Sequence, residues 1–300
     1  MMIVYNPRSS HFGRVRDEVL AVSRELSGWT VGKFEVAPTD VDDNAERLAG
    51  LLNDGDLVVS AGGDGTATIA LNGVMLSRAK EVKLGVLSYG NFNDTVRTLG
   101  KSSFAEIVEG KTTKVWPLEC LVNGEHFRWG MGYFTVGLFA EACAVFDQKD
   151  NRRELRTGEK GMIYSIWLLK KWYFKNRKRG FLGGFMLERG GEKRHFEGMT
   201  DYVAVNGRSM ARVMRGGRWF LDKNKFLSET RSLQSFWGLG RLMVRSMVAR
   251  IPGEETSRDV LVFDEPGKVM VQGEGEYRKF EGVKSLEFRK TERPVTVVMK

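Results

Sequence analysis

The chain has 300 residues, of which 42% are hydrophobic and 28% are charged, and its formal net charge is +9. This composition excludes a largely disordered chain, and the length favours two domains, or one domain with a large appendage, over a single core. The positive charge favours a polyanionic partner, which leaves nucleotides, nucleic acids and anionic membrane surfaces open.

No segment is expected to cross a membrane. Residues 1–10 lack a basic stretch followed by a sustained apolar run, so we expect no signal peptide. No apolar run approaches the roughly 18 residues that a spanning helix needs. The two cysteines, Cys120 and Cys143, have no metal-ligand spacing and suit a reducing compartment. We therefore expect a folded, cytoplasmic protein.

The first third of the chain alternates short β-branched runs with amphipathic stretches, which predicts a parallel sheet flanked by helices. The expected strands cover residues 2–5, 29–36, 56–60 and 83–87. The expected helices cover residues 13–26, 41–52 and a stretch that follows Gly65. A capping box at Ser103–Glu106 predicts the start of another short helix.

From about Val115 onwards, glycines separate segments of alternating apolar residues, which predicts a β-rich second domain. The expected strands cover residues 127–134, 181–187, 201–205, 268–271 and 295–299, and helices are expected near 162–175 and 233–249. The predicted domains are residues 1–115 and 116–300, and the last segment can return to the first domain.

A glycine-rich turn, Gly62-Gly63-Asp64-Gly65-Thr66, lies directly between an apolar strand and a predicted helix. Glycines let the backbone approach phosphate oxygens, and the N-terminus of the helix that follows favours negative charge. Asp64 can orient a metal, a lysine or a substrate hydroxyl. The alternative is an ordinary tight turn in which Asp64 satisfies local amides. The turn has neither the Gly-Lys-Ser/Thr ending of a Walker loop nor dinucleotide glycine spacing.

The turn resembles the GGDGT motif of diacylglycerol kinases and sphingosine kinases and, in shorter form, of NAD kinases. Further segments resemble the lipid kinases rather than the NAD kinases. They are Asn6–Ser10, Ala67–Val74, Leu84–Arg97, Phe127–Ala142, Val203–Gly207 and Val271–Tyr277. We find no convincing Asn-Glu pair of the kind expected in an NAD kinase.

This resemblance implies an α/β protein with a Rossmann-like N-terminal nucleotide domain, a β-sandwich second domain and a catalytic cleft between them. It also implies an ATP- and Mg²⁺-dependent kinase that phosphorylates the hydroxyl of diacylglycerol or a related lipid alcohol. Two alternatives stay open, namely a catalytically weakened lipid- or nucleotide-binding protein of the same fold and an NAD kinase.

By the same resemblance, one group of residues contacts the nucleotide, and Gly62 to Thr68 cradle its phosphates. The group comprises Asn6, Arg8, Ser9, Ser10, Thr39, Gly62, Gly63, Asp64, Gly65, Thr66, Thr68, Asn91, Asn93 and Asp94. Thr39 can equally be the cap of the helix that follows it, and Asn93 and Asp94 can equally cap a short helix.

Glu276 matches the proton acceptor of some family members, and Glu274 matches the aspartate two positions before it. Side chains at i and i+2 of an extended strand face the same side, so both carboxylates can line one cleft. The alternative is two solvated glutamates on an edge strand. Asp222 is the candidate metal ligand in residues 207–227. Ser10, Asn91 and Glu274 replace the residues usual in the family.

Residues 163–185 combine tryptophan, tyrosine and phenylalanine with a series of lysines and arginines. Aromatic rings settle at the headgroup level of a membrane, and basic residues are attracted to anionic lipids. We expect peripheral contact with a lipid substrate at the inner membrane face, although a core helix followed by a solvated basic loop fits as well. No nucleic-acid partner is expected, because no reader domain is recognisable.

Overall fold

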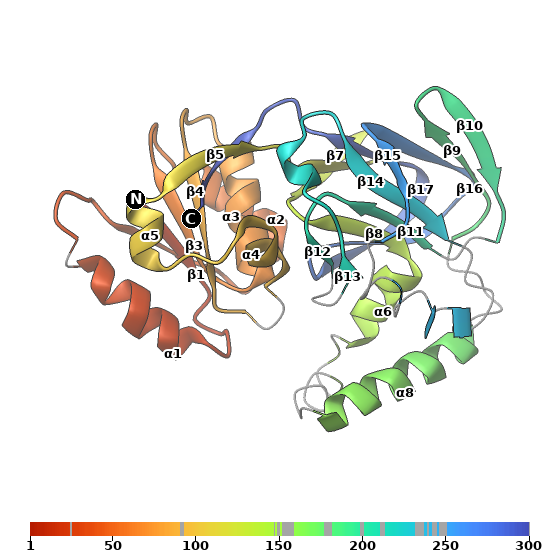
Figure 1. Ribbon diagram of the computed structural model, residues 1–300, viewed down its shortest axis with the longest axis horizontal. Helices are drawn as coiled ribbons and strands as arrows, with labels where there is room; N and C mark the ends of the chain where they lie inside the picture. Colours follow the sequence, from red (N-terminus) through yellow and green to blue (C-terminus); the bar gives the residue numbers. More distant parts are fainter. Residues whose placement is uncertain are drawn as a thin grey trace.

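The computed structural model describes most of the chain, and the expected features that fall outside it are Asn91, positions 177–181 of the basic and aromatic 163–185 segment, and almost all of the 233–249 helix. The described residues are 1–24, 26–90, 93–146, 148, 151, 159–176, 182–198, 201–210, 214–231, 237–238, 240–241, 245 and 251–299. They form two units that lie side by side, each built around its own sheet (Figure 1).

The first unit contains a six-stranded sheet in the order β2-β1-β3-β4-β18-β5. Its strands are β1 (Met2–Tyr5), β2 (Gly32–Glu35), β3 (Leu57–Gly62), β4 (Lys83–Ser88), β5 (Lys111–Val115) and β18 (Val295–Met299). The pairs β1–β2, β1–β3, β3–β4 and β4–β18 are parallel, and β5 runs antiparallel to β18. The last strand of the chain therefore returns to the first sheet.

Helices accompany this sheet in the alternating order that the sequence predicts. They are α1 (Phe12–Val15), α2 (Val41–Ala49), α3 (Asp64–Leu76), α4 (Asp94–Leu99) and α5 (Phe104–Glu109). The helix expected at 13–26 is broken into α1, a π turn at Arg16–Leu20 and a 3₁₀ turn at Val22–Arg24. The capping box at Ser103 and Glu106 is confirmed, with both of its reciprocal bonds present.

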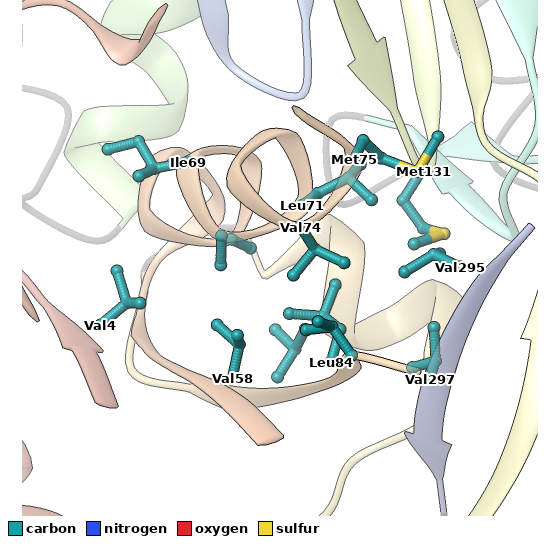
Figure 2. Packing of buried hydrophobic residues seen from close by; sticks show 14 of the residues in the cluster. Val4, Val58, Ile69, Leu71, Val74, Met75, Leu84, Met131, Val295 and Val297 are labelled. Carbon is teal, nitrogen blue, oxygen red and sulfur yellow. The ribbon is translucent and has the colours of Figure 1, made fainter. Parts of the chain in front are cut away.

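Helix α3 is buried along nearly its whole length, from Thr66 to Met75. Leu71 and Val74 pack against strand residues such as Leu84 (Figure 2). The same core cluster includes Met131, which comes from the second unit, and Val297, which comes from the last strand. Because α3 has both units as neighbours, the segment that follows the glycine turn has a fixed position between them.

The second unit contains one ten-stranded antiparallel sheet, and a separate two-stranded hairpin lies beside it. The sheet comprises β6 (Leu118–Val122), β7 (Glu125–Gly130), β8 (Tyr133–Gly137), β9 (Phe185–Arg189), β10 (Glu192–Phe196), β11 (Asp201–Val205), β14 (Phe226–Arg231), β15 (Glu254–Thr256), β16 (Arg258–Gly273) and β17 (Glu276–Lys290). The hairpin comprises β12 (Ser209–Met210) and β13 (Met214–Arg215).

The long hairpin of β16 and β17 organises this sheet. The first part of β16 pairs with β9, the last part pairs with β8, and the last part of β17 pairs with β6. Apolar residues from all these strands share one core, which includes Phe134, Phe185 and Phe288. The expected α/β fold with a β-rich second unit is confirmed, and its second unit is one continuous sheet around a common core rather than two separate sheets.

Among the elements whose bounds the structure describes, two α-helices and a 3₁₀ turn also belong to the second unit. They are α6 (Leu138–Phe146), α8 (Glu159–Asn176) and the 3₁₀ turn η3 (Trp219–Leu221). Helix α8 lies beside α6 and away from both sheets (Figure 1). Among the described residues, no helix has the length and apolar character required to span a membrane.

Candidate active site

The strand order places a natural binding position at the carboxyl ends of β1 and β3. From β1 the chain moves outward to β2, and it then returns past β1 to form β3 on the other side. In open parallel sheets, ligands bind where the strand order reverses in this way. The turn that starts at Asn6 follows β1, and the glycine turn follows β3, so both flank this position.

The glycine turn is fixed by the loop that follows β4. The Tyr89 N–H donates to the Gly62 carbonyl at 3.0 Å. A Cβ on Gly63 would lie 3.2 Å from the Gly90 Cα, and a Cβ on Gly62 would overlap the side chain of Thr66. The backbones of the two loops thus touch directly, which explains the glycines at positions 63 and 90, whereas Gly62 leaves room for the Thr66 side chain.

Gly65 allows a carboxylate of the second unit to reach the start of α3. A Cβ at this position would overlap the Glu276 carboxylate. Gly65 occupies the second position of α3, where backbone N–H groups lack helical partners and attract negative charge. The glycine turn therefore brings together a site suited to anions and an acidic side chain that is 211 positions away in the sequence.

Glu274 and Glu276 do not lie on a continuous extended strand, so that expectation was wrong. Gly273 pairs with Glu276, and Glu274 and Gly275 form the two-residue turn of the β16–β17 hairpin. Both turn residues have positive φ, 52° for Glu274 and 89° for Gly275, as a type I′ turn requires. The turn, rather than strand alternation, directs both carboxylates towards the glycine turn.

Glu274 is buried between the two units, with 2% of its surface exposed. Its Oε1 accepts a short hydrogen bond from the Gly132 N–H, and its Oε2 lies 3.4 Å from the Thr68 Oγ1. Burial raises the pKa of Glu274 to about 8, and the negative charges of Asp64 and Asp94 add to this effect. A solvated glutamate on an edge strand is thus excluded for this position.

Asp64 and Asp94 belong to the same buried acidic group. The Thr95 N–H donates to Asp64 Oδ1 at 3.1 Å, and burial raises the Asp64 pKa to about 6 despite this bond. Asp94 accepts a hydrogen bond from Ser209 Oγ at 2.8 Å, so it joins α4 to the second unit. The two aspartates and Glu274 bring three carboxyl groups together directly beside the glycine turn.

Asn93 occupies the N-cap position of α4 and has a left-handed backbone conformation, but its side chain forms no capping hydrogen bond with the helix. Its Oδ1 accepts from the Gly90 N–H at 2.8 Å, and its Nδ2 donates to the Gly90 carbonyl at 2.6 Å. Both bonds hold Gly90 against Gly63. Asn93 therefore supports the shape of the glycine turn.

The turn after β1 is held by its own hydrogen bonds. Asn6 Oδ1 accepts from the Arg8 N–H at 3.0 Å, and an Arg8 guanidinium nitrogen donates to the Val36 carbonyl at 3.2 Å. Ser9 Oγ is buried and has no hydrogen-bond partner among the described residues. Ser10 is exposed. An unpartnered hydroxyl at the strand-order reversal suits a polar ligand.

Thr39 does not cap α2. Asp40 is the cap residue, and its side chain accepts from the Asp43 N–H at 2.8 Å. The Thr39 hydroxyl instead accepts from Asn44 Nδ2 at 2.9 Å. A contact between Thr39 and a nucleotide stays a prediction.

Asp222 lies in a turn of the second unit. Its Oδ1 accepts from the Asn224 N–H at 2.8 Å, which makes it a turn residue after η3. Throughout the part of the chain that the structure describes, no three His, Cys, Asp or Glu side chains gather so as to hold a metal ion.

The sequence did not point to Gly90, Gly132, Ser209 or Asn72 as parts of the site. Asn72 bonds the Trp129 backbone in both directions, at 2.9 and 3.0 Å, and so ties α3 to β7. The available signal for Gly90 was a glycine shortly after the strand expected at 83–87. Ser209 gave no signal, because its partner Asp94 is 115 positions away.

Comparison with known proteins gives matches to one family. Residues 1–120 match the model of the diacylglycerol kinase catalytic domain. The resemblance to this family is thereby confirmed. A diacylglycerol kinase of Staphylococcus epidermidis is 35% identical over 121 residues, which are 38% of this chain and 37% of that protein. A diacylglycerol kinase of Staphylococcus haemolyticus is 32% identical over 120 residues, which are 38% of this chain and 36% of that protein.

The match to these curated relatives thus spans little more than a third of their own length. A crystal structure of a diacylglycerol kinase from Bacillus anthracis str. Sterne covers 100% of this chain and 96% of that chain, with a TM-score of 0.69 and 15% identity. At this identity the likeness concerns the fold, which extends over both units.

Proposed function

We propose that the chain is an ATP-dependent kinase that phosphorylates the hydroxyl of diacylglycerol or a related lipid alcohol. The observation that carries the proposal is the position of Glu276. The β16–β17 hairpin of the second unit brings this carboxylate onto Gly65, at the N-terminus of the helix that follows the glycine turn. A phosphate site and a proton acceptor then lie together at the junction of the two units.

The glycine turn fits the phosphates of ATP. Gly63 and Gly90 pack backbone against backbone. Because positions 62, 63 and 65 are glycines, they have no side chain of their own that could cover their backbone amides. The α3 N-terminus supplies N–H groups and a favourable dipole. Ser9 Oγ, buried without a partner among the described residues, is available to a polar ligand on the other side of the strand-order reversal.

The acidic group beside the turn fits Mg²⁺ held jointly with phosphate. Mg²⁺ sites of this kind use one or two carboxylates and take their other ligands from phosphates and water. Asp64 would hold the ion. Burial and the negative charge of Asp94 raise the pKa of Asp64, and a bound cation would offset the negative charge of the two aspartates. Bound Mg²⁺ would offset the charge that develops on the transferred phosphoryl group.

The two glutamates have different proposed roles. Glu276 is partly exposed and so can accept a proton from a lipid hydroxyl that enters between the units. Glu274 is buried and bonded to the Gly132 N–H, so it is a positioning residue that holds the hairpin turn against α3.

Helix α8 is the surface that we assign to the membrane. Trp167 and Phe174 are 51% and 45% exposed, and they are two turns apart on one face of the helix. Lys170, Lys171 and Lys175 are exposed on the same helix, and Lys171 Nζ lies 5.1 Å from the Trp167 ring centroid. Aromatic and basic groups in this arrangement suit an anionic lipid surface.

Phosphotransfer from labelled ATP to a panel of lipid alcohols in mixed vesicles tests the proposal. We expect a labelled phospholipid with at least one neutral acceptor, and no label on NAD. Label on NAD alone would identify an NAD kinase. ATP binding without transfer to any acceptor would identify a binding protein and would contradict the proposed activity.

A further inference from the structure

A polar hollow lies in the second unit, beside η3 and next to the start of β12 and the end of β13. It is open to solvent, has a volume of about 570 Å³ and is lined by Arg208, Gly216, Gly217, Arg218, Trp219 and Asp222. None of these residues belongs to the glycine turn or to the buried acidic group. We call it the arginine hollow.

Two hydrogen-bond donors of the residues that line the arginine hollow have no partner among the described residues. Arg208 Nε and Trp219 Nε1 are both buried, and neither donates to any atom of the described residues. A buried donor left unsatisfied costs about 1–3 kcal/mol, so native proteins rarely keep two together without a ligand or water. Gly217 is needed here, because a Cβ at that position would overlap the indole nitrogen.

The charges of the arginine hollow favour an anion. Within the described ranges, no carboxylate forms an ion pair with Arg208 or Arg218. Burial, and then the neighbouring charge of Arg218, lower the pKa of the Arg208 guanidinium. Asp222 is the acidic residue of the lining, and one of its oxygens already accepts from the Asn224 N–H. Two guanidinium groups against one carboxylate leave a net positive lining.

The same charges disfavour a metal at Asp222, and a metal-binding role for this residue stays a prediction. A divalent cation at Asp222 would stand among the arginines that line the same hollow, and repulsion would oppose its binding. The carboxylate is instead engaged in the turn after η3.

We propose that the arginine hollow binds a phosphate monoester, with Arg208 and Arg218 on its oxygens and the Trp219 indole N–H as a third donor. Guanidinium groups bind phosphate through paired N–H bonds, and a tetrahedral dianion can accept from three directions at once. The phosphate can belong to a soluble metabolite or to the headgroup of a phospholipid. The proposal does not depend on phosphotransfer at the glycine turn.

The indole N–H provides a direct readout. In protein with ¹⁵N-labelled tryptophan, the Trp219 signal is assigned by its loss in Trp219→Phe, and glycerol 3-phosphate is titrated in. We expect a saturable shift of this signal and none of Trp237, which is 80% exposed. Arg218→Gln and Arg208→Gln each weaken binding about tenfold or more. The control is Arg215→Gln, an exposed arginine of β13 outside the hollow, which leaves the affinity unchanged.

A second arm distinguishes the sources of the phosphate. Phosphatidylcholine vesicles with and without a phosphomonoester lipid are compared in a flotation assay with the same variants. A response to soluble glycerol 3-phosphate that Arg218→Gln removes identifies a soluble ligand. A response to the vesicles alone, again removed by Arg218→Gln, identifies a headgroup site. No response in either arm, or equal losses in Arg215→Gln and Arg218→Gln, would overturn the proposal.

Discussion

Gly65 is one of the residues at which the two units meet in the candidate site. Alanine here would push its methyl group into the Glu276 carboxylate. We expect Gly65→Ala to lower the rate of lipid phosphorylation at least tenfold, because shifts of about 1 Å in a reacting group reduce rates by factors of this order or more. The rate measured with labelled ATP and vesicles checks this.

Gly13 offers a matched control for that substitution. It lies in α1 with open space around its Cα and an ordinary backbone conformation. Gly13→Ala should leave both the rate and the thermal midpoint nearly unchanged. Equal losses of rate in the two alanine variants would show that the contact between Gly65 and Glu276 has no special importance.

Replacement of Glu276 separates an enzyme from a binding protein. Glutamine keeps the size of the side chain but cannot accept a proton at neutral pH. We expect Glu276→Gln to reduce kcat about 10²–10⁴-fold, the usual contribution of a general base, with little change in the Kd for ATP. Single-turnover kinetics and a direct nucleotide titration measure the two quantities. An unchanged kcat would assign the proton transfer to another group.

Glu274 makes folding stability depend on pH in a defined direction. Its pKa rises from the ordinary value of 4.5 to about 8 in the folded protein, so the folded state keeps a proton that the unfolded state releases. Its contribution to stability is therefore complete below the unfolded pKa and is lost as the pH rises through about 8. Asp64, with a pKa of about 6, acts in the same direction.

The prediction is that Glu274→Gln flattens this dependence. The Gln side chain can still accept from the Gly132 N–H, but it has no proton to lose. Thermal midpoints measured between about pH 5 and pH 8 should fall less steeply in the variant than in the natural protein. Glu125→Gln, on an exposed residue of β7, should reproduce the natural slope. An unaltered slope in Glu274→Gln would contradict the assigned burial of this carboxyl.

At the scale of elements, the parts of the fold that could be predicted are those set by local pattern. The strands at 2–5, 201–205 and 295–299 have the expected bounds, because each is a short apolar run bordered by clear breaks. The Ser103 capping box was equally local. Strand β17 was missed, since its many charged residues conceal the alternation that pairs it with β16.

Of the candidate site, only the glycine turn could be predicted from the sequence. Gly62 to Thr66 form one continuous turn, so their joint position follows from the sequence. The relation between Glu274 and Glu276 depends on two positive φ angles in the hairpin turn, which no strand periodicity reveals. The contacts of Asp94 with Ser209 and of Gly65 with Glu276 join segments more than 100 positions apart, and such pairings arise only when the two units pack.

Helix α8 carries a prediction at this scale. If its aromatic face enters a lipid surface, Trp167→Ser combined with Phe174→Ser should weaken binding to anionic vesicles about tenfold or more, since each buried aromatic side chain contributes about 1.5–3 kcal/mol. Vesicle sedimentation measures the partition. Val22→Ser, which removes an exposed apolar side chain of the first unit, is the control and should have no effect. Equal binding of the double variant and the natural protein would show that α8 does not form the membrane-binding surface.

For the whole molecule, the most consequential feature is that the first sheet is completed by the end of the chain. Strand β18 lies between β4 and β5 and pairs with both. Val297 is fully buried in the same core as Leu84 and Leu71. A protein ending at Val115 would lack this strand, so β5 would have no partner and the edge of β4 would be open. We expect residues 1–115 alone to aggregate or to unfold without a cooperative transition.

The register of β5 and β18 suggests the variant that restores the sheet. The two strands are antiparallel, and Val115 pairs with Val295. An Asn-Gly turn that joins Val115 directly to Val295 should therefore form a two-residue hairpin and return β18 to its place. Thermal unfolding followed by circular dichroism should show a cooperative transition for this fusion and none for residues 1–115. The same fusion with Val297→Asp is the control, because a charge in the buried core should abolish the transition. If residues 1–115 unfolded cooperatively at the same temperature as the fusion, the last strand would not be needed to complete the first sheet.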